Sequence, residues 1–500
     1  MGLTPAPTEA WYLAWIALVP LWILIKQCSP SSLRQTFFFG LAWGCGYHGL
    51  ALFWITGVHP MTWMGVPWLA SLAIALFCWI FITLWGAILV TIWSLGIGFY
   101  QRLNCLKKNR AIDSLLTILF GVSLWCGLEF LWSQGDLWWT SLSYTQSPHN
   151  LAILQLTQIS GPSTVTAAIV LVNGIFAEAI AIDKKKFQIK KSFLFTSLTV
   201  LVSLHLIGFI LYNRPIAKPS EAAIAVGIIQ GNIPNEIKLY SRGGRKALAG
   251  YTNGYQKLAD RGVDIVLTPE TALPFYWHNL VRNRSSFYEA ILDKQVPVWI
   301  GAFGKKGDRY TNSLFTITGD GNTYSRYDKV KLVPLGEYIP FENILGKIID
   351  RLSPLDSHLA FGDREPILDT PLGKVTVGIC YESAFSEHFR RQTARGSQFI
   401  ITASNNAHYS NTMPAQHHAQ DVIRAIENDR WAARATNTGY SAIVDPRGNT
   451  LWISGINTYE IHADTIYKRQ TKTFYVLWGD WLTAVLLISE GVIFVKQITK

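Results

Sequence analysis

The sequence predicts an α/β domain attached to a multi-span α-helical membrane domain, and three observations predict it. Hydrophobic residues make up 49% of the 500 residues and charged residues only 15%, whereas globular proteins average about 25% charged residues. Most of this bias lies in the first 213 residues, and one apolar run returns near the end. Between them, strand-like and helix-like patterns alternate, as in layered α/β domains. We therefore expect a membrane domain at 1–213, an α/β domain at 214–473, and a transmembrane helix with a short cytoplasmic tail at 474–500.

Seven apolar stretches are long enough to cross a bilayer, which takes about 20 mainly apolar residues. Six lie in the membrane domain and one near the C-terminus, at 10–26, 36–57, 67–98, 112–133, 159–181, 193–213 and 477–496. The opening residues lack a basic segment, so no cleavable signal peptide is expected.

Basic residues gather in alternate loops. The loops after the first, third and fifth spans contain lysine or arginine, such as Arg34, Arg102 and Lys190, whereas those after the second and fourth contain none. The positive-inside rule then places the α/β domain on the outer face of a plasma membrane. It also places Met1 outside, so we expect one helix to be missing ahead of Met1. A genuine seven-span protein that begins outside is the alternative.

The net charge of +11 does not indicate a nucleic-acid partner, because the basic residues form topological clusters or lie scattered. Of six cysteines only Cys380 lies in the α/β domain, so no disulfide forms within it. No cysteine pair has zinc-binding spacing, so a structural metal is not expected. Cys380 alone is either a packing residue or a nucleophile.

The α/β domain is predicted from short β-rich runs that end in turn residues. Helices are expected at 248–260 and 415–434, and a hairpin at 441–452 turns at Pro446–Gly448. The other predicted strands and their turns are 223–232, 263–270, 296–304, 313–329, 374–383 and 398–406.

Three ionisable residues follow predicted strands directly: Glu270, Lys329 and Cys380. The ends of buried strands are where layered α/β folds assemble sites. A thiol near neutral pH needs a base, which Glu270 would supply. Lys329 is expected to lower the thiol pKa and to stabilise an oxyanion, with the backbone N–H of Tyr381 as a second donor.

An ordered set of motifs resembles the nitrilase superfamily. Together with the membrane spans, and with GLEFLWSQGDLWWTSLSYTQ at 127–146, it resembles the apolipoprotein N-acyltransferases in particular. The resemblance covers nearly the whole chain. The motifs are QGNIP, VLTPETALP, YTNSL, YDKVKLVPLGEYIPFE, GICYESAF, ASNNAHYS, QHHAQDVIRAIE and ATNTGYSAIVDPRG.

The resemblance implies a nitrilase-like α-β-β-α sandwich and an N-acyltransferase without a cofactor. A phospholipid would acylate Cys380, and the amine of a lipoprotein's diacylglyceryl-cysteine would then take the acyl chain. Glu270 matches the general base, Lys329 the catalytic lysine and Cys380 the nucleophile. Supporting roles fall to Glu337, which orients the lysine or shuttles protons, and to Tyr381 and Glu382 beside the nucleophile. We expect a monomer in the inner membrane of a bacterium, facing the periplasm.

The sequence departs from the usual family pattern at four positions: Thr268, Leu239, Lys331 and His408 stand where other residues are common. None of them belongs to the predicted triad. They bear instead on acyl-chain preference and on how the lipoprotein is held.

Other readings stay open at this point. A membrane-tethered amidase or hydrolase would release the acyl group to water, and a non-catalytic binding protein would keep only the fold. Glu129 lies in a span, where carboxylates are functional candidates, but its position beside Trp132 equally favours snorkelling to the interface. His408, His417 and His418 form a weak metal candidate. The segment 341–365 is a candidate mobile lid.

Overall fold

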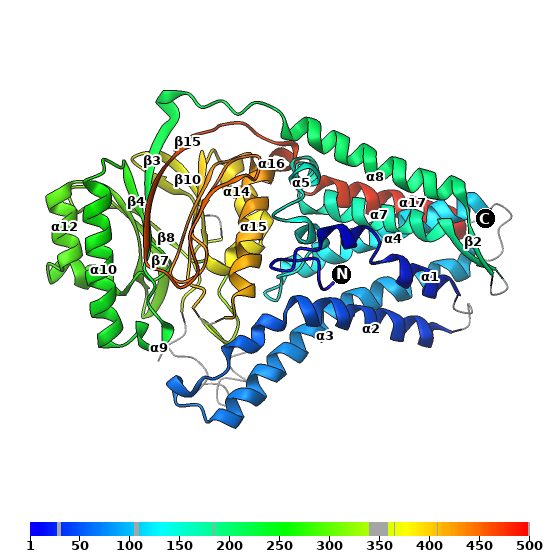
Figure 1. The fold of residues 1–500 in the computed structure, drawn as a ribbon, viewed down its shortest axis with the longest axis horizontal. Coiled ribbons are helices and arrows are strands. Elements are labelled where there is room, and N and C mark those ends of the chain that lie inside the picture. Colours follow the sequence, from blue (N-terminus) through cyan, green and yellow to red (C-terminus); the bar gives the residue numbers. More distant parts are fainter. Residues whose placement is uncertain are drawn as a thin grey trace. The chain divides into compact units, whose positions relative to one another are not determined.

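The computed structural model describes residues 1–27, 32–104, 110–183, 186–339, 359–364, 366–407 and 409–498. The chain forms two compact units (Figure 1). The helical unit comprises Met1–Thr56, Ala75–Arg214 and Trp478–Lys500, and the sandwich unit comprises Gly57–Ile74 and Pro215–Leu477. Residues 57–74, between the second and third predicted spans, thus join the sandwich unit.

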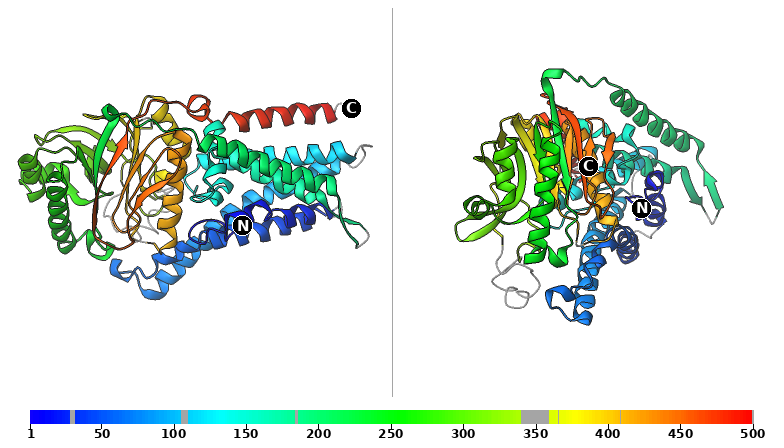
Figure 2. Two further views of the ribbon diagram at one scale, coloured as in Figure 1. Left: turned by 45° about the horizontal axis from the view of Figure 1, so that its top comes forward. Right: turned by 60° about the vertical axis from the view of Figure 1, so that its left-hand side comes forward.

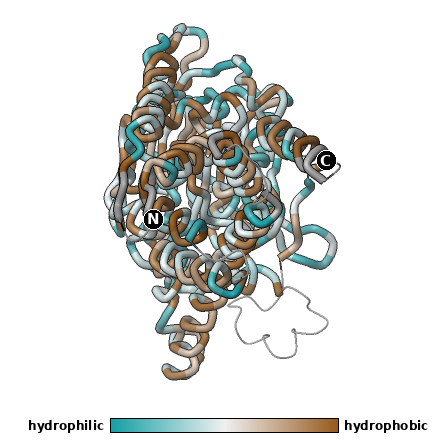
Figure 3. Tube along the Cα trace, turned by 90° about the vertical axis from the view of Figure 1, so that its right-hand side faces the viewer, coloured by the Kyte–Doolittle hydropathy of each residue, from teal (hydrophilic) through white to brown (hydrophobic). Residues whose placement is uncertain are grey.

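The helical unit is built from apolar helices, and Figure 3 shows hydrophobic colour on many of the helical turns that face the viewer. Among the described residues, four helices are long and apolar enough to cross a membrane: α3, α4, α7 and α8. The helices of this unit are α1 (Val19–Gln27), α2 (Leu33–Ala51), α3 (Trp68–Asn104, whose first turns belong to the sandwich unit), α4 (Arg110–Gln134), α5 (Leu151–Leu154), α6 (Thr157–Ser160), α7 (Pro162–Ala179), α8 (Lys191–Tyr212) and α17 (Trp481–Ile498). Shorter elements are the 3-10 helices η1 (Trp11–Trp15), η2 (Phe53–Val58) and η4 (Leu142–Gln146) and the hairpin β1 (Ile180–Asp183) with β2 (Lys186–Ile189).

Small residues let α2 and α3 approach closely. A Cβ atom on Gly40 would lie 2.6 Å from Ser94 Oγ, and one on Gly44 would lie 2.7 Å from the Cα of Ala87. Glycines four residues apart on one helix face are a common packing device between membrane helices, because they allow backbones into contact.

The helix boundaries differ from two of the predicted spans. The first span is a 3-10 helix followed by α1, rather than one continuous helix. The fifth is divided at Gly161, whose φ of 71° ends α6 and whose successor Pro162 starts α7. Proline suits this first helical position, where the missing N–H has no partner to lose. The number of crossings and their orientation stay predictions.

Glu129 does not snorkel to an interface. Its side chain is buried, and its carboxylate accepts hydrogen bonds from Trp125 Nε1 at 3.0 Å, Ser141 Oγ at 2.7 Å, the backbone N of Leu142 at 2.8 Å and Thr166 Oγ1 at 2.9 Å. The prediction that Glu129 snorkels to an interface is therefore wrong, because Ser141 and Leu142, which follow α4 in the chain, donate hydrogen bonds to its buried carboxylate.

The sandwich unit contains two mixed sheets. One has the order β15-β3-β4-β6-β7-β8, with β5 also paired to β6, and the other has the order β14-β13-β12-β11-β10-β9. The strands are β3 (Ala223–Gln230), β4 (Ile265–Leu267), β5 (Leu273–Tyr276), β6 (Val298–Lys306), β7 (Arg309–Ile317), β8 (Thr323–Asp328), β9 (Leu368–Thr370), β10 (Gly373–Ile379), β11 (Phe399–Ser404), β12 (Ala432–Thr436), β13 (Ala442–Val444), β14 (Thr450–Ile453) and β15 (Glu460–Tyr467).

Helices cover the outer faces of both sheets, as two views show (Figures 1 and 2). One apolar core, including Ile228, Trp299 and Val377, fills the space between the sheets, and a second, including Tyr255 and Phe287, lies under α10 and α12. The α-β-β-α layering expected for this unit is confirmed. Its helices are α9 (Asn235–Lys238), α10 (Ser241–Ala259), α11 (Trp277–Arg282), α12 (Ser286–Lys294), α14 (Ser386–Ala394), α15 (Thr412–Asn428) and α16 (Phe474–Trp478), with the 3-10 helices η3 (Thr62–Met64), η5 (Ser220–Ala222) and η6 (Cys380–Ala384).

The predicted strand–turn segments and the hairpin at 441–452 are present, except that 313–329 contains the end of β7, a turn and β8 rather than a single strand. The helix predicted at 415–434 extends too far, because Asp429 adopts a left-handed conformation with φ of 51° and ends α15. Residues 432–434 instead begin β12, a central strand of the second sheet.

Candidate active site

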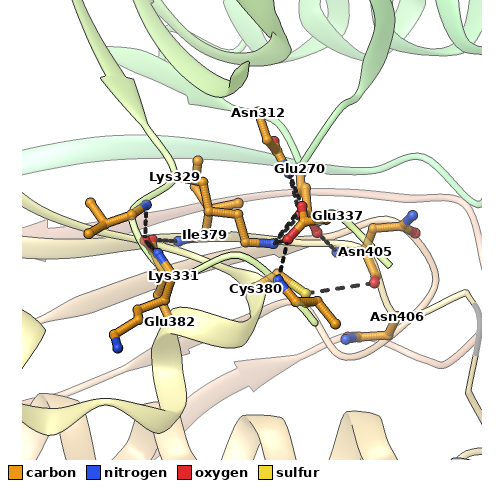
Figure 4. A network of polar contacts seen from close by, with 12 residues as sticks. Glu270, Asn312, Lys329, Lys331, Glu337, Ile379, Cys380, Glu382, Asn405 and Asn406 are labelled. Carbon is orange, nitrogen blue, oxygen red and sulfur yellow. Dashed lines mark hydrogen bonds and ion pairs between the residues drawn. The ribbon is translucent and has the colours of Figure 1, made fainter. Parts of the chain in front are cut away.

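The three predicted catalytic residues lie just beyond three strand ends. Glu270 follows β4 by three residues, Lys329 directly follows β8, and Cys380 directly follows β10. Strands β4 and β8 belong to one sheet and β10 to the other. Figure 4 shows Glu270, Lys329 and Cys380 converging, together with Glu337.

Lys329 is held between two carboxylates. Its Nζ lies 2.9 Å from Glu270 Oε1 and 2.9 Å from Glu337 Oε2, and its side chain is only 1% exposed. Asn312 on β7 bridges the same carboxylates, donating from Nδ2 to Glu270 Oε1 at 2.7 Å and to Glu337 Oε1 at 3.0 Å. Glu337 Oε2 also accepts the backbone N–H of Val333 at 2.8 Å, which fixes its carboxylate. Glu337 thus contacts the lysine that it was predicted to orient.

The ion pair determines the charge states of this site. Burial alone would raise the pKa of Glu270, but Lys329 and then Lys238 and Asn312 outweigh burial, so this pKa lies below its ordinary value. Burial opposes the charge of Lys329 too, yet Glu270 and Glu337 hold its pKa well above the usual range. Both groups are therefore charged at neutral pH, and Glu270 is available as a base.

Cys380 sits on a strained turn. Its φ is +54°, a left-handed conformation that non-glycine residues adopt rarely and that is often found at functional sites. His417 on α15 holds this turn, because its Nε2 donates to the carbonyl oxygen of Cys380 at 2.7 Å. Burial lowers the pKa of His417 to about 3, so the ring is neutral and acts as a single donor at this nitrogen.

The thiol of Cys380 is protonated in the resting site. Burial, followed by the charge of Glu270, raises its pKa to about 12, and the opposing effect of Lys329 is smaller. Lys329 lowers the thiol pKa as expected, but burial and the charge of Glu270 outweigh it, so this pKa lies above its ordinary value. The sequence could not reveal this, because the result depends on burial and on the nearby carboxylate. A protonated thiol makes a base necessary.

Glu382 ties the nucleophile turn to the segment that follows Lys329. Its fully buried carboxylate accepts backbone N–H groups from Val330 at 2.6 Å, Lys331 at 3.0 Å and Ile379 at 2.7 Å. It also accepts the hydroxyl of Tyr327 at 2.7 Å. Because these donors come from both sheets, Glu382 fixes the register between Lys329 and Cys380.

Tyr381 follows the nucleophile directly, and its ring meets Phe385 edge-on with centroids 5.1 Å apart. Its predicted role as an oxyanion donor concerns the backbone N–H and stays a prediction.

Asn405 links the base to the nucleophile and was not predicted as a site residue. Its backbone N donates to Glu270 Oε2 at 2.8 Å, and its carbonyl oxygen lies 3.9 Å from Cys380 Sγ (Figure 4). Asn312 was missed in the same way. Both asparagines lie inside family-like motifs, YTNSL and ASNNAHYS, which carried the only signal for them.

The residues that depart from the family pattern lie in different surroundings. Thr268 is buried, and its hydroxyl accepts from the N of Gly301 at 3.1 Å and donates to the carbonyl of Trp299 at 3.2 Å, so it braces the Glu270 loop. Leu239 is 39% exposed and Tyr240 is 55% exposed. His408 lies outside the described residues.

The metal candidate has no support from the two histidines that the structure describes. His417 contacts the nucleophile turn, whereas His418 Nε2 lies 3.0 Å from Thr450 Oγ1. Within the described ranges, no cluster of His, Cys, Asp or Glu side chains is arranged to hold a metal ion. The lid predicted at 341–365 lies outside the described residues except for 359–364 and stays a prediction.

Two family descriptions match the chain. Residues 226–469 match the carbon-nitrogen hydrolase family, and residues 1–175 match the apolipoprotein N-acyltransferase N-terminal domain. Among solved structures, an amidase from Nesterenkonia sp. is 18% identical, with a TM-score of 0.39 over 53% of this chain and 95% of its own.

Curated relatives match at full length. An apolipoprotein N-acyltransferase from Nostoc sp. is 58% identical over 97% of this chain and 95% of its own length. Another from Synechocystis sp. is 51% identical over 100% of this chain and 99% of its own. A third, from Thermosynechococcus vestitus, is 41% identical over 96% and 90%. Because this identity extends over both the helical unit and the nitrilase-like sandwich unit, the chain belongs to the apolipoprotein N-acyltransferases.

Proposed function

We propose that this enzyme transfers a fatty acyl chain from a phospholipid to the α-amino group of a lipoprotein's diacylglyceryl-cysteine, through a thioester on Cys380. The observation that carries the proposal is the pairing of a protonated, buried thiol on a strained turn with an ionised carboxylate beside it. Such a pair suits nucleophilic catalysis in which the base acts only when substrate is present.

In the first step, Cys380 Sγ attacks the ester carbonyl carbon of the phospholipid while Glu270 takes the thiol proton. The new C–S bond forms and the carbonyl oxygen becomes an oxyanion. When this intermediate collapses, the C–O bond breaks, and Glu270 returns its proton to the departing oxygen of the lysophospholipid. The acyl chain then remains on Cys380 as a thioester.

In the second step, the free amine of the lipoprotein attacks the thioester carbonyl and gives a proton to Glu270. The C–S bond breaks, an amide is formed, and the thiolate of Cys380 regains the proton from Glu270. Each step begins and ends with the same charge on the site, so Glu270 serves as the base and the acid in turn.

Lys329 supplies a fixed positive charge for the developing oxyanion, and the backbone N–H of Tyr381 adds a directed donor. Glu337, with Asn312, holds the Lys329 amine in place, and Glu382 sets the turn that carries Cys380. No cofactor is required, because every proton and bond is accounted for by the side chains and the two substrates.

The setting of the reaction is a membrane. The four membrane-length helices and the family membership support an integral membrane enzyme. In our proposal it is a monomer that crosses the inner membrane of a bacterium several times and carries its sandwich unit on the periplasmic face, where lipoprotein amines are exposed. The charge pattern of the loops supports this orientation.

The experiment that tests transfer follows the fate of the acyl chain. Purified enzyme receives phospholipid with a labelled acyl chain and a diacylglyceryl-cysteine peptide, and the matched control is the same peptide with an acetylated amine. We expect labelled amide with the free amine and none with the blocked one. Labelled free fatty acid as the main product with both peptides would instead identify a hydrolase.

A further inference from the structure

A second lysine, Lys238, lies beside the site and has no part in the mechanism above. It is the last residue of the short helix α9, and its side chain is only 3% exposed. Its Nζ donates to the backbone carbonyl of Glu270 at 3.1 Å. Lysine is almost never fully buried without a partner, so a buried ammonium beside the predicted base calls for a role.

The surrounding structure fixes α9 in place. A Cβ atom on Gly243 of α10 would lie 1.9 Å from the carbonyl oxygen of Ile237 and 2.7 Å from the Cα of Lys238, so α10 packs directly on the α9 backbone. On the other side, Asn235 Oδ1 accepts from Asn405 Nδ2 at 3.1 Å. Since Asn405 also binds the Glu270 carboxylate, the position of Lys238 is coupled to that of the base.

Lys238 completes the charge balance of the site. Glu270 and Glu337 contribute two negative charges and Lys329 one positive charge, which leaves the group at minus one. The charge of Lys238 brings the total to zero. A thiolate forming at Cys380 meets a more favourable potential in a neutral group than in an anionic one, because like charges in a buried site repel strongly.

Glu270 and Cys380 are the titratable groups that act on the ammonium of Lys238. Burial lowers its pKa to about 8, while Glu270 and Cys380 act in the opposite direction. Glu236 on its own helix and Arg242, Arg245 and Lys246 on α10 are exposed to solvent, which screens them. Lys329 keeps its charge at alkaline pH, because its pKa lies well above the usual range.

We infer that Lys238 is a positioning residue of this acyl transfer: it holds the Glu270 backbone and supplies the buried positive charge that balances the group formed by Glu270, Glu337 and Lys329. The inference rests on the proposed thioester chemistry. It predicts that acylation of Cys380 slows as pH rises past about 8, because the loss of the Lys238 proton leaves the site anionic.

The test compares Lys238→Met, which removes the charge, with Lys238→Arg, which keeps it. The matched control is Lys246→Met, since Lys246 also donates to a backbone carbonyl, that of Asn232 at 3.2 Å, but is exposed. The measurement is the single-turnover rate of Cys380 acylation by phospholipid, followed by intact mass from neutral to alkaline pH.

We expect Cys380 to be acylated about tenfold or more slowly in Lys238→Met at neutral pH, because a tenfold change corresponds to a shift of about one unit in the thiol pKa. The rate of this variant should also no longer decline at alkaline pH. Lys238→Arg should keep the decline but move it to higher pH, and Lys246→Met should match the wild type. Wild-type rate and pH profile in Lys238→Met would overturn the inference. An equal loss of acylation rate in Lys238→Met and Lys238→Arg, with the alkaline decline at the wild-type pH, would also overturn it, because that result would indicate a structural role alone. If the wild type forms no adduct at all, it is the proposed function that fails.

Discussion

Lys329 and Glu270 form an almost fully buried ion pair, with Nζ 2.9 Å from Oε1 and only 1% and 8% of the two side chains exposed. Removing one partner of such a pair leaves an uncompensated charge and destabilises a protein by about 3–5 kcal/mol. Truncation to alanine would therefore confuse loss of fold with loss of chemistry. Substitutions that preserve side-chain size separate these two effects better.

Glu270→Gln should slow acylation of Cys380, and its amide group facing the N–H donors of the native carboxylate should lower the free energy of unfolding by about 1–3 kcal/mol. The amide retains an oxygen for Lys329 but cannot accept the thiol proton, and general-base catalysis typically contributes about 10²–10⁴-fold in rate. Single-turnover acylation followed by intact mass measures this loss. The control is Glu236→Gln, an exposed glutamate on α9. Equal rates in wild type and Glu270→Gln would show that another group is the base.

Asn312→Asp should move the acidic limb of the pH–rate profile upwards. In the wild type the pKa of Glu270 lies below its ordinary value, so acylation should persist into weakly acidic solution and fall only when Glu270 is protonated. An aspartate at this position replaces the donor that lies 2.7 Å from Glu270 Oε1 with a like charge, which favours the protonated base. Rates measured across acidic pH test this, with the exposed Asn283→Asp as control. An unmoved limb in Asn312→Asp would mean that Asn312 does not influence the base.

Gly301→Ala should disturb the Glu270 loop from the neighbouring strand. A Cβ atom on Gly301 would lie 2.0 Å from the carbonyl oxygen of Pro269 and 2.8 Å from the N of Thr271. We expect a loss of about 1–3 kcal/mol in the free energy of unfolding, as for other overpacked sites, and slower acylation. Thermal unfolding and acylation assays check both. Gly250→Ala, which adds a Cβ 3.6 Å from the Tyr459 ring, should be nearly neutral. A fully active Gly301→Ala would show that the loop position is not critical.

Glu382→Gln should destabilise the sandwich unit and impair acylation together. One carboxylate oxygen would become an NH₂ group facing backbone N–H donors, and an unsatisfied buried polar group costs about 1–3 kcal/mol. Denaturant unfolding measures this change. Tyr327→Phe removes a single donor at 2.7 Å and should have a smaller effect. If Glu382→Gln were as stable and active as the wild type, the proposed link between the two strand ends would be wrong.

The sequence was sufficient to predict the layered sandwich and the three strand-end residues. Apolar β-rich runs ending in Glu270, Lys329 and Cys380 mark strand ends locally, and strand ends are where α/β sites assemble. Strand β15 was missed because most of its residues are only half buried, so its sequence lacks the apolar alternation that marks a strand.

The surroundings of the site could not be predicted, because they depend on tertiary packing. Asn312 reaches Glu270 only through the pairing of β7 beside β6. Lys238 is an ordinary lysine in the sequence and becomes informative only when buried against Glu270. The raised pKa of Cys380 likewise reflects burial, which no local pattern records.

The central claim is that Cys380 carries the acyl chain, and intact-mass analysis of the purified enzyme tests it most directly. Wild-type protein and Cys380→Ser are each incubated with a phospholipid and then with a diacylglyceryl-cysteine peptide. We predict one added acyl mass on the wild type, cleaved by hydroxylamine as a thioester and discharged by the peptide, and no thioester on Cys380→Ser. An acyl adduct of the same lability on Cys380→Ser, or amide formation by that variant at the wild-type rate, would contradict the account.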